Sequence, residues 1–442
     1  MSTVGVSRDE ALQVLRRMRT GQPIAEALTA SHRQRPLDPK DRALLTQLVY
    51  GVTRHRRFLD AIIHNFAKDP LEPDVKDILR LGFFQLKFLD KIPAYAVVNA
   101  AVEETKLVQP KATRLVNAVL RRGQSYEPRD LSLGDRYSHP DWLIERWSRR
   151  FGKKLPDILA ANNQIPPLTL RVNPDQVTRD KVLEELTAAG VAVEPSPYVE
   201  AAVRVTGSVW LEDLPLFQSG RVTVQDESGM LVTLVLDPKP GERILDMAAG
   251  VGGKTGHILE YSHGRSHLVA MDVSRERLTM LRRNVKRLGF TEDQVETIQG
   301  DATLAPKTLG LGSFDRVLVD APCSNLGVLR RRVDARWNKN LEDLKGHQRR
   351  QVQLLEAAIL AAKPGGVIVY STCSVEPEET LDVIRRIEAE MPEVRRESVA
   401  DWLPHRALQS QVEKGTLTLL PGDFGMDGFF IARLRTKAGG EP

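Results

Sequence analysis

The front part of the chain carries apolar residues at three- and four-residue spacing, which places them on one face of an α-helix. This spacing runs through residues 11–18, 42–66 and 74–90, and the prolines fall between the runs. Proline breaks a helix from within but is tolerated in the connections between helices. The pattern therefore predicts an all-helical domain over residues 1–125, with a polar linker after it.

The pattern changes after residue 136. A small α+β connecting subdomain is expected over residues 137–220, because short helical runs alternate there with strand-like pieces such as residues 168–173. Over residues 221–436, apolar β-rich runs alternate with amphipathic helical stretches. The strand-like runs are RILDMAA, HLVAMDV, VETIQGD, FDRVLVDA and GVIVYST. Such alternation is typical of a doubly wound, mostly parallel sheet, so the predicted fold class is α/β with a Rossmann-like domain in this last part.

Composition narrows the class of protein. Hydrophobic residues make up 41% of the 442 residues and charged residues 27%, and no apolar run is long enough to cross a bilayer. The N-terminal stretch enters an amphipathic helix directly and lacks the apolar core of a secretory signal, so a cytoplasmic protein without membrane contact is expected. Two cysteines, Cys323 and Cys373, are too few for a disulfide framework or a cysteine-rich zinc site, and no metal is expected.

Positive charge is concentrated at the front of the chain. Lysine and arginine together number 63 against 58 aspartates and glutamates, but within residues 1–130 they number 22 against 15. A basic helical domain indicates a polyanionic partner, most simply a nucleic acid, although a solvated helical surface would have the same composition.

A glycine-rich turn follows the first strand of the Rossmann-like domain, where such folds bind cofactors. Its residues are Ala248, Ala249, Gly250, Val251, Gly252, Gly253 and Lys254. The turn matches neither GxGxxG nor GxxxxGK[ST], which disfavours a dinucleotide or ATP. Asp272 ends the second strand, where an acid accepts hydrogen bonds from ribose hydroxyls, and Asp301 follows the third strand, within expected reach of an adenine. One strand edge thus supplies, in chain order, the glycine-rich turn, an acid for the ribose (Asp272) and an acid for the adenine (Asp301). S-adenosylmethionine is therefore the predicted cofactor.

Both cysteines follow strands of the same predicted sheet. Cys323 follows the fourth strand within Asp-Ala-Pro-Cys-Ser, and Cys373 follows the fifth within Tyr-Ser-Thr-Cys-Ser. A lone cysteine is most often a small buried hydrophobe. Two cysteines at one sheet edge, above the expected cofactor and with none elsewhere, indicate chemistry instead.

A thiol beside a methyl donor suits methylation of a pyrimidine at C5, because this carbon is too weakly nucleophilic to attack the donor unaided. A thiolate that adds to C6 makes C5 enamine-like. C5 then takes the methyl group, a base removes its proton, and elimination frees the thiolate. Asp320, at the end of the fourth strand, is expected to hold the N3 position of the ring and to stabilise charge during the addition. An N-methylating enzyme would instead place an aromatic side chain where Cys323 stands.

These motifs resemble those of the RsmB/Sun family of bacterial rRNA cytosine-5 methyltransferases, and the resemblance extends over nearly the whole chain. VNAVLRR, residues 116–122, is similar to the end of the family's NusB-like RNA-binding domain. The other similar blocks are SHPDWLIERW, PPLTLRVN, VQDESG, GVLRRRVDARW and GMDGFFIARL. The resemblance implies methylation of C5 of a cytosine in 16S rRNA through a covalent cysteine–C6 adduct.

The resemblance also implies residue roles. Cys373 would be the nucleophile and Cys323 would assist product release, while Asp320 would serve both catalysis and the cofactor. DNA cytosine-5 methyltransferases place the nucleophile in their Pro-Cys turn, so Cys323 stays open as the alternative nucleophile. The implied cofactor positions are residues 248–254, Asp272, Asp301 and Asp320.

Basic side chains follow the Cys323 turn. Residues 329–350 hold eight lysines and arginines against three acids, and basic groups beside an active site suit the phosphate backbone of an RNA. A solvated loop and helix start would have a similar composition. The candidate RNA-binding residues are Arg330, Arg331, Arg332 and Arg336.

Two alternatives stay open. A tRNA cytosine-5 methyltransferase would use the same chemistry on another RNA, and a non-catalytic RNA-binding ribosome assembly factor would carry a degenerate cofactor turn. The family usually has Cys-Ala-Ala-Pro-Gly-Gly-Lys in that turn, and this chain lacks its cysteine and its proline. Retention of Cys373, Cys323 and Asp320 favours the enzyme. RNA is the expected partner, and a monomer is the expected state.

Overall fold

A computed structural model describes residues 5–207 and 214–438, and the chain forms two compact units. The first unit extends to Gln164 and also includes Leu329–Asn338, whereas the second contains Ile165–Val328 and the chain from Lys339 onward. The chain therefore passes between the units three times. The predicted ranges 1–125 and 137–220 include residues 1–4 and 208–213, which lie outside the described residues.

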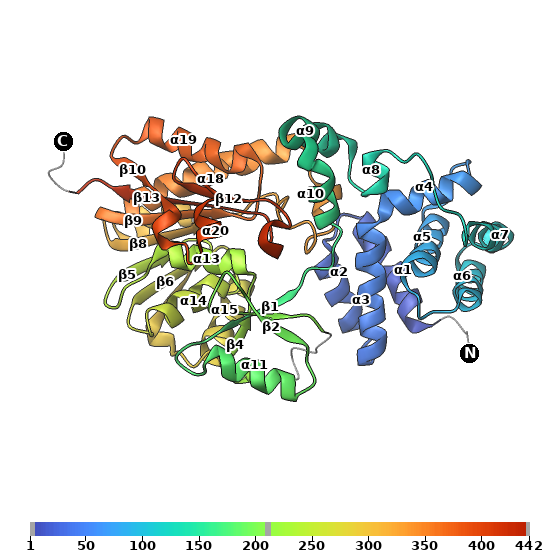
Figure 1. Ribbon diagram of the computed structural model, residues 1–442, viewed down its shortest axis with the longest axis horizontal. Helices are drawn as coiled ribbons and strands as arrows, with labels where there is room; N and C mark the ends of the chain where they lie inside the picture. Colours follow the sequence, from blue (N-terminus) through green and yellow to red (C-terminus); the bar gives the residue numbers. More distant parts are fainter. Residues whose placement is uncertain (1–4, 208–213, 439–442) are drawn as a thin grey trace. The chain divides into compact units, whose positions relative to one another are not determined.

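The described residues of the first unit form helices joined by loops, without any β-strand. Its amphipathic runs form helices that bury one apolar stripe each, and Leu12, Leu48, Ile78 and Leu120 from four of these helices share a single core. Figure 1 shows the helices from α1 to α10 in blue to green. The helices of the unit are α1 (Val6–Arg19), α2 (Ile24–Gln34), α3 (Pro39–Arg54), α4 (Arg56–Phe66), α5 (Pro73–Phe88), α6 (Ala94–Val108), α7 (Thr113–Gly123), α8 (Leu133–Arg136), α9 (Asp141–Phe151), α10 (Leu155–Ala161) and α17 (Ala335–Asn338).

The segment Leu329–Asn338 belongs to this helical unit although it is inserted in the sequence of the second. Val333 is fully buried among the helical core residues. The amide of Ile24 donates to the carboxylate of Asp334 at 3.2 Å, and the indole of Trp337 donates to the carbonyl oxygen of Thr53 at 2.9 Å. The inserted segment is therefore a part of the first unit's core.

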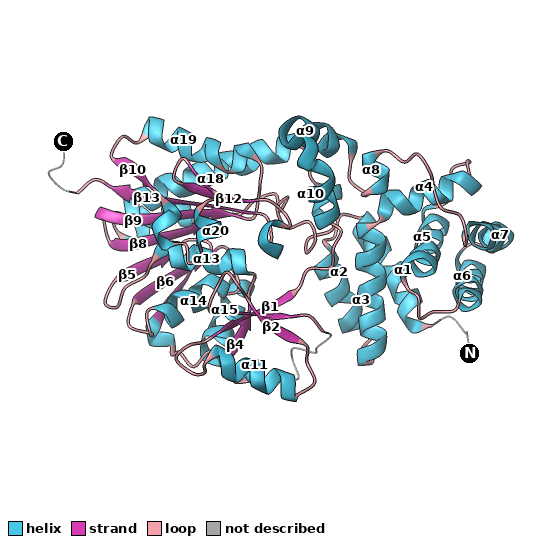
Figure 2. Cartoon of the chain, in the orientation of Figure 1, coloured by secondary structure: helices cyan, strands magenta, loops and turns pink. Residues whose placement is uncertain are grey.

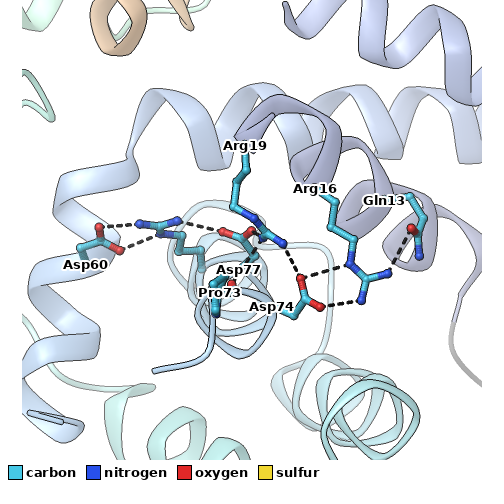
Figure 3. A network of polar contacts seen from close by, with 8 residues as sticks. Gln13, Arg16, Arg19, Asp60, Pro73, Asp74 and Asp77 are labelled. Atoms are coloured by element: carbon cyan, nitrogen blue, oxygen red, sulfur yellow. Dashed lines mark hydrogen bonds and ion pairs between the residues drawn. The ribbon is translucent and has the colours of Figure 1, made fainter. Parts of the chain in front are cut away.

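Some of the positive charge at the front of the chain is neutralised inside the helical unit. Figure 3 shows Arg16 and Arg19 of α1 converging on Asp74 near the start of α5, at N–O distances of 2.7 and 2.5 Å. Arg19 also pairs with Asp77, to which Arg80 donates from the same helix at 2.8 Å. Arg16 and Arg19 thus join α1 to α5, while Arg80 pairs within α5 and with Asp60 of α4, so part of the positive charge at the front of the chain serves the packing of these helices.

The second unit begins with a small antiparallel sheet in the order β2-β3-β1-β4, which confirms the predicted α+β character. Helix α11 packs Val182 and Leu186 against Leu170 and Val203 of this sheet. The elements are β1 (Leu168–Val172), α11 (Arg179–Ala188), β2 (Val193–Pro195), β3 (Ala202–Val205), α12 (Pro215–Gln218) and β4 (Val222–Val224).

A larger sheet forms the centre of the second unit, and its described strands follow the order β11-β12-β13-β9-β8-β5-β6-β7, with β10 paired to β13. Strands β5 to β9 are parallel to one another, as the sequence predicts, and form the Rossmann-like part. Strands β10 to β13 add antiparallel pairs that the alternation of strands and helices did not predict. The strands are β5 (Arg243–Asp246), β6 (His267–Asp272), β7 (Val295–Gln299), β8 (Phe314–Asp320), β9 (Ala362–Thr372), β10 (Val394–Glu397), β11 (Val412–Glu413), β12 (Thr416–Leu419) and β13 (Phe429–Thr436).

Helices cover both faces of the larger sheet (Figure 2). Successive residues of a strand point to opposite faces, so Ile244 shares one core with residues of α13, α14 and α15, whereas Leu245 shares another with residues of α18 and α19. The helices are α13 (Glu227–Leu236), α14 (Gly253–Tyr261), α15 (Arg275–Arg287), α16 (Ala305–Leu309), α18 (Leu341–Ala361), α19 (Leu381–Glu390) and α20 (Arg406–Gln409). Among the described residues, no helix is long and apolar enough to span a membrane.

Candidate active site

The carboxyl ends of the parallel strands bring the predicted site residues to one edge of the larger sheet. The glycine turn follows β5, Asp272 ends β6, Asp320 ends β8 and Cys373 follows β9. These four strands are neighbours in the order β9-β8-β5-β6, so they share one edge, as the sequence pattern indicated.

Backbone and side-chain hydrogen bonds hold the glycine turn, the predicted cofactor turn of residues 248–254, in place. The amide of Ala249 donates to the carbonyl of Met271 at 2.9 Å, and Asn284 of α15 donates to the carbonyl of Val251 at 2.8 Å. Gly250 and Gly252 have φ angles of 56° and 88°, in the left-handed region that favours glycine. A Cβ added at Gly250 or Gly253 would meet nothing within 4 Å, so the turn keeps open space beside its backbone.

Asp272 fastens the turn to the end of β6. It is 6% exposed, and one carboxylate oxygen accepts from the amide of Gly250 at 3.0 Å while the other accepts from the amide of Ser274 at 2.8 Å. A carboxylate offers about four lone-pair positions, so both oxygens keep capacity for a further donor such as a ribose hydroxyl.

Within the described part of the chain, Asp301 accepts hydrogen bonds at one of its two oxygens. Its Oδ1 accepts from Arg350 of α18 at 2.5 Å and from the amide and hydroxyl of Thr303 at 2.9 and 2.8 Å. The guanidinium of Arg350 lowers the pKa of Asp301 to about 2, and the Thr303 donors add to the effect. Asp301 is therefore a carboxylate at neutral pH.

An ion pair joins the cofactor turn to the end of β8. The ammonium of Lys254 lies 2.6 Å from Oδ2 of Asp320, and the Ser371 hydroxyl donates to Oδ1 at 2.8 Å. Burial works against the charge of Lys254, but Asp320, with smaller contributions from Cys373 and Asp246, more than offsets it, so the pKa of the lysine is raised. Lys254 therefore stays charged at neutral pH, and Asp320 accepts a hydrogen bond at each of its oxygens.

The two thiols lie 3.1 Å apart. Cys323 is 8% exposed and Cys373 is half-buried. The hydrogen bond with Cys373, together with burial, raises the pKa of the Cys323 thiol well above its usual range, and the charge of Glu379 adds to the rise. Cys323 therefore stays protonated at neutral pH. The thiol of Cys373 also donates to the side-chain oxygen of Asn325 at 3.2 Å.

The two cysteine turns pack against each other through their backbones. The amide of Gly327 donates to the carbonyl oxygen of Cys373 at 3.0 Å, and the amide of Gly428 donates to Gly327 at 2.8 Å. A Cβ on Gly327 would lie 2.9 Å from the Cys373 carbonyl oxygen, closer than real Cβ atoms approach. Glycine at position 327 is therefore required for this approach of the turns.

The candidate RNA-binding arginines belong to the first unit, whereas the residues at the sheet edge belong to the second. Arg332 is exposed and Arg331 is half-buried. The structure contradicts the expectation that Arg330 and Arg336 present charge at the surface, because they are 2% and 0% exposed.

Arg336 acts as a buried donor within the helical unit. Its guanidinium donates to the carbonyl oxygens of Ser138 and Asn162 at 3.1 and 3.0 Å and to the side chain of Asn163 at 2.8 Å. Burial and the charge of Arg54 lower the pKa of Arg336 to about 9, so it stays charged at neutral pH. The guanidinium of Arg336 therefore binds backbone carbonyl oxygens of the protein, whereas the sequence pattern predicted that it binds RNA phosphates.

Sequence reasoning missed several groups at the sheet edge. Asn325 contacts the Cys373 thiol, Glu379 contacts the residues that follow both cysteines, and Arg350 contacts Asp301. One signal was available, because each cysteine is followed by a serine, in Pro-Cys-Ser and in Thr-Cys-Ser. Within residues 5–207 and 214–438, no group of three or more histidine, cysteine or acidic side chains is arranged to hold a metal ion.

Comparison with known families matches three successive parts of the chain. Residues 6–125 match the NusB family, residues 139–212 match the ferredoxin-like domain of RsmF/B-like methyltransferases, and residues 233–435 match the 16S rRNA methyltransferase RsmB/F. The fold class predicted from the sequence is thus confirmed.

Individual relatives match along most of their length. The probable ribosomal RNA small subunit methyltransferase B of Bacillus subtilis (strain 168) is 35% identical over 97% of this chain and 98% of its own. Ribosomal RNA small subunit methyltransferase B of Serratia proteamaculans (strain 568) is 36% identical over 91% of this chain and 92% of its own. The crystal structure of the protein PH0851 is 26% identical, with a TM-score of 0.82 over 98% of this chain and 99% of that one.

Proposed function

Because the chain belongs to the RsmB/F family of rRNA small subunit methyltransferases, we propose that it methylates C5 of a cytosine in 16S rRNA through a covalent bond between Cys373 and C6. S-adenosylmethionine supplies the methyl group, carried on a sulfonium that a carbon nucleophile attacks. The observation that carries the proposal is the pair of thiols, 3.1 Å apart, at the sheet edge that also carries Asp320 and the cofactor turn.

Cys373 is the proposed nucleophile. The raised pKa of Cys323 keeps its proton on at neutral pH, so Cys323 is poorly suited to attack but can donate a hydrogen bond to the neighbouring sulfur 3.1 Å away. Cys373 is also the more exposed thiol, and it is close enough to Lys254 for the two groups to interact electrostatically. A cation near a thiolate stabilises it. These features disfavour the alternative in which Cys323 attacks the base.

The reaction balances around the Cys373 sulfur. The thiolate forms the S–C6 bond, and the electron pair of the C5–C6 double bond shifts onto C5 and is delocalised through C4 to N3. A proton held between N3 and Asp320 stabilises the charge that reaches N3 during this addition. C5 then takes the methyl group and loses its proton to a base. The S–C6 bond breaks last, which restores the double bond and the Cys373 thiolate, and Cys323 assists this release.

The residues of the turn fit the proposed cofactor. Open space beside Gly250 and Gly253 admits a ligand close to the backbone, Asp272 accepts from the ribose hydroxyls, and the free Oδ2 of Asp301 accepts from the adenine amino group. The exposed apolar side chain of Val273 follows Asp272 and offers a surface for the adenine ring. The full proposed set is residues 248–254, Asp272, Asp301 and Asp320.

The helical part is the proposed RNA-docking domain. We propose that a NusB-like RNA-binding domain covers residues 1–125, a connecting subdomain covers 137–220 and a methyltransferase domain covers 221–436. We also propose that the protein acts on RNA in the cytoplasm and that it is a monomer. Arg331 and Arg332 are the arginines of the inserted segment that we propose for phosphate contacts, since Arg330 and Arg336 are buried.

Methyl transfer to purified RNA tests the proposal. The protein is incubated with S-adenosylmethionine labelled in its methyl group and with either 16S rRNA or tRNA, and the nucleosides are then separated. We expect label in 5-methylcytidine from 16S rRNA. Label in tRNA alone would favour the tRNA methyltransferase, and binding of RNA without any methyl transfer would favour a non-catalytic assembly factor.

A further inference from the structure

Both cysteines precede a serine, and the two serines share one buried carboxylate. The hydroxyls of Ser324 and Ser374 each donate to Oε2 of Glu379 at 2.5 Å. The amide of Ser324 donates to the other oxygen, Oε1, at 2.8 Å. All three residues are fully buried.

A third element completes the contacts of this carboxylate. Gln351 of α18 donates to Oε1 of Glu379 at 3.3 Å and to the carbonyl oxygen of Pro322 at 3.0 Å. Glu379 ends the short 3-10 helix Pro377–Glu379, and its own carbonyl accepts from the hydroxyl of Tyr370 on β9 at 2.8 Å. One side chain thus contacts the loop after β8, the loop after β9 and α18.

A buried carboxylate is stable only while several donors surround it. The serine donors of Glu379 come from two separate turns, so each turn is held in the position that satisfies the shared carboxylate. Since Cys323 and Cys373 are bonded directly to the two serines, fixing the serines also fixes the start of each thiol side chain. If either turn moved, Glu379 would lose one of its hydrogen-bond donors. The positions of the two thiols are therefore coupled through this carboxylate.

We propose that Glu379 is a positioning residue that holds the Cys323-Ser324 and Cys373-Ser374 turns together, so that both thiols act on one base. The proposal rests on the proposed function for its consequence in catalysis. The arrangement of the thiols themselves does not depend on that function, and it can be measured separately.

The thiol arrangement is measured with phenylarsine oxide, a trivalent arsenical. Its arsenic forms bonds to two neighbouring thiols and releases its oxygen as water, without any need for RNA or cofactor. The variant is Glu379→Gln, which keeps the size of the side chain but removes its charge. The matched control is Glu390→Gln, the same change at an exposed residue of α19 that pairs with Arg386. We expect Glu379→Gln to lower the affinity for the arsenical about tenfold or more, while the control behaves as the unsubstituted protein.

Catalysis provides the second measurement. In Glu379→Gln we expect kcat for RNA methylation to fall about tenfold or more, with the KM for RNA and the affinity for S-adenosylmethionine changed less than about twofold. Arsenical affinity equal to that of the unsubstituted protein would overturn the positioning role, whatever happens to kcat. Absence of methylation in the unsubstituted protein, together with the expected arsenical result, would instead overturn the proposed function alone.

A second variant keeps the test decisive if Glu379→Gln does not fold. Ser374→Ala removes one donor from the Cys373 turn and leaves the carboxylate in place. We expect a smaller loss of arsenical affinity and of kcat in the same direction. Unchanged arsenical affinity in folded Ser374→Ala would contradict the proposal.

Discussion

The sulfur atoms of Cys323 and Cys373 lie 3.1 Å apart, although the residues are fifty positions apart in the sequence, and they are the two cysteines of the whole chain. Parallel neighbours β8 and β9 produce this relationship, because each cysteine follows the carboxyl end of its strand. The difference between the thiols, one deeply buried and protonated and the other half-buried, is the basis for assigning them different roles.

Substitution of each cysteine should separate the two roles. Cys373→Ala should abolish methylation and form no covalent RNA adduct, because no thiolate remains in the attacking position. Cys323→Ala should form the adduct and release it slowly, so that protein bound to RNA accumulates on a denaturing gel. The reverse pattern would assign the attack to Cys323.

Asp272→Ala should weaken binding of S-adenosylmethionine. The variant loses an ionised acceptor for the ribose and also the bonds that fasten Gly250 and Ser274, so the loss should be about 1.5 to 3 kcal/mol, or roughly tenfold to a hundredfold in affinity. Calorimetry measures it, and affinity for RNA serves as the control that should hardly change. Unchanged cofactor affinity in the folded variant would refute this placement of the ribose.

Two arginines of the inserted segment should respond differently to substitution. Arg332→Glu should weaken RNA binding, and the slope of log affinity against log salt concentration should become shallower by about one. Thermal stability should change little, because the Arg332 side chain is exposed. Arg336→Met should destabilise the helical unit by about 2 kcal/mol or more, since it leaves buried carbonyls without their donor. Equal stability of the two variants would contradict the structural role of Arg336.

The stability of the helical unit should fall as the pH rises, because of Glu104 on α6. Burial, with help from the charge of Asp9, raises the pKa of Glu104 from 4.5 to about 8. The folded unit therefore holds this proton more tightly than the unfolded chain does. The stabilisation is fully present below about pH 4.5 and is lost as the pH rises through 8, by about 5 kcal/mol in total.

Hydrogen exchange of the α6 amides between pH 5.5 and 8.5, corrected for the intrinsic exchange rates, measures this effect. Glu104→Gln should flatten the pH dependence, because the group that titrates is gone. The control is Glu103→Gln, the neighbouring residue, which is paired with Lys106 at the surface and should leave the pH dependence intact. Identical profiles for all three proteins would contradict the assignment.

The features that could be predicted are those that depend on the local spacing of apolar residues and on the order of strands and helices along the chain. Apolar spacing is enough to indicate the helices of the first unit, and the alternation of strands and helices places Asp272, Asp320 and Cys373 at one sheet edge. Both inferences need only the period of the pattern and the rule that parallel strands share their carboxyl edge.

The sequence could not predict what depends on distant partners. Arg332 and Arg336 belong to one basic run and look alike in sequence, yet Arg336 is buried because the backbone carbonyls of Ser138 and Asn162 surround it. Glu379 likewise differs little in sequence from Glu378, which is half-buried, and only the folded turns bring two serines to it. Burial of a charged group depends on donors and acceptors far along the chain, which a local pattern does not contain.

The most direct test of the account is the site of a trapped RNA adduct. A 16S rRNA fragment that carries 5-fluorocytidine cannot lose a proton from C5 after methyl transfer, so the covalent complex should persist. Digestion of this complex and mass spectrometry of the peptides then identify the attached residue. We predict a nucleotide linked through C6 to Cys373, formed only when S-adenosylmethionine is present to complete the transfer. Attachment at Cys323, or no adduct from an RNA that the protein methylates, would contradict the account.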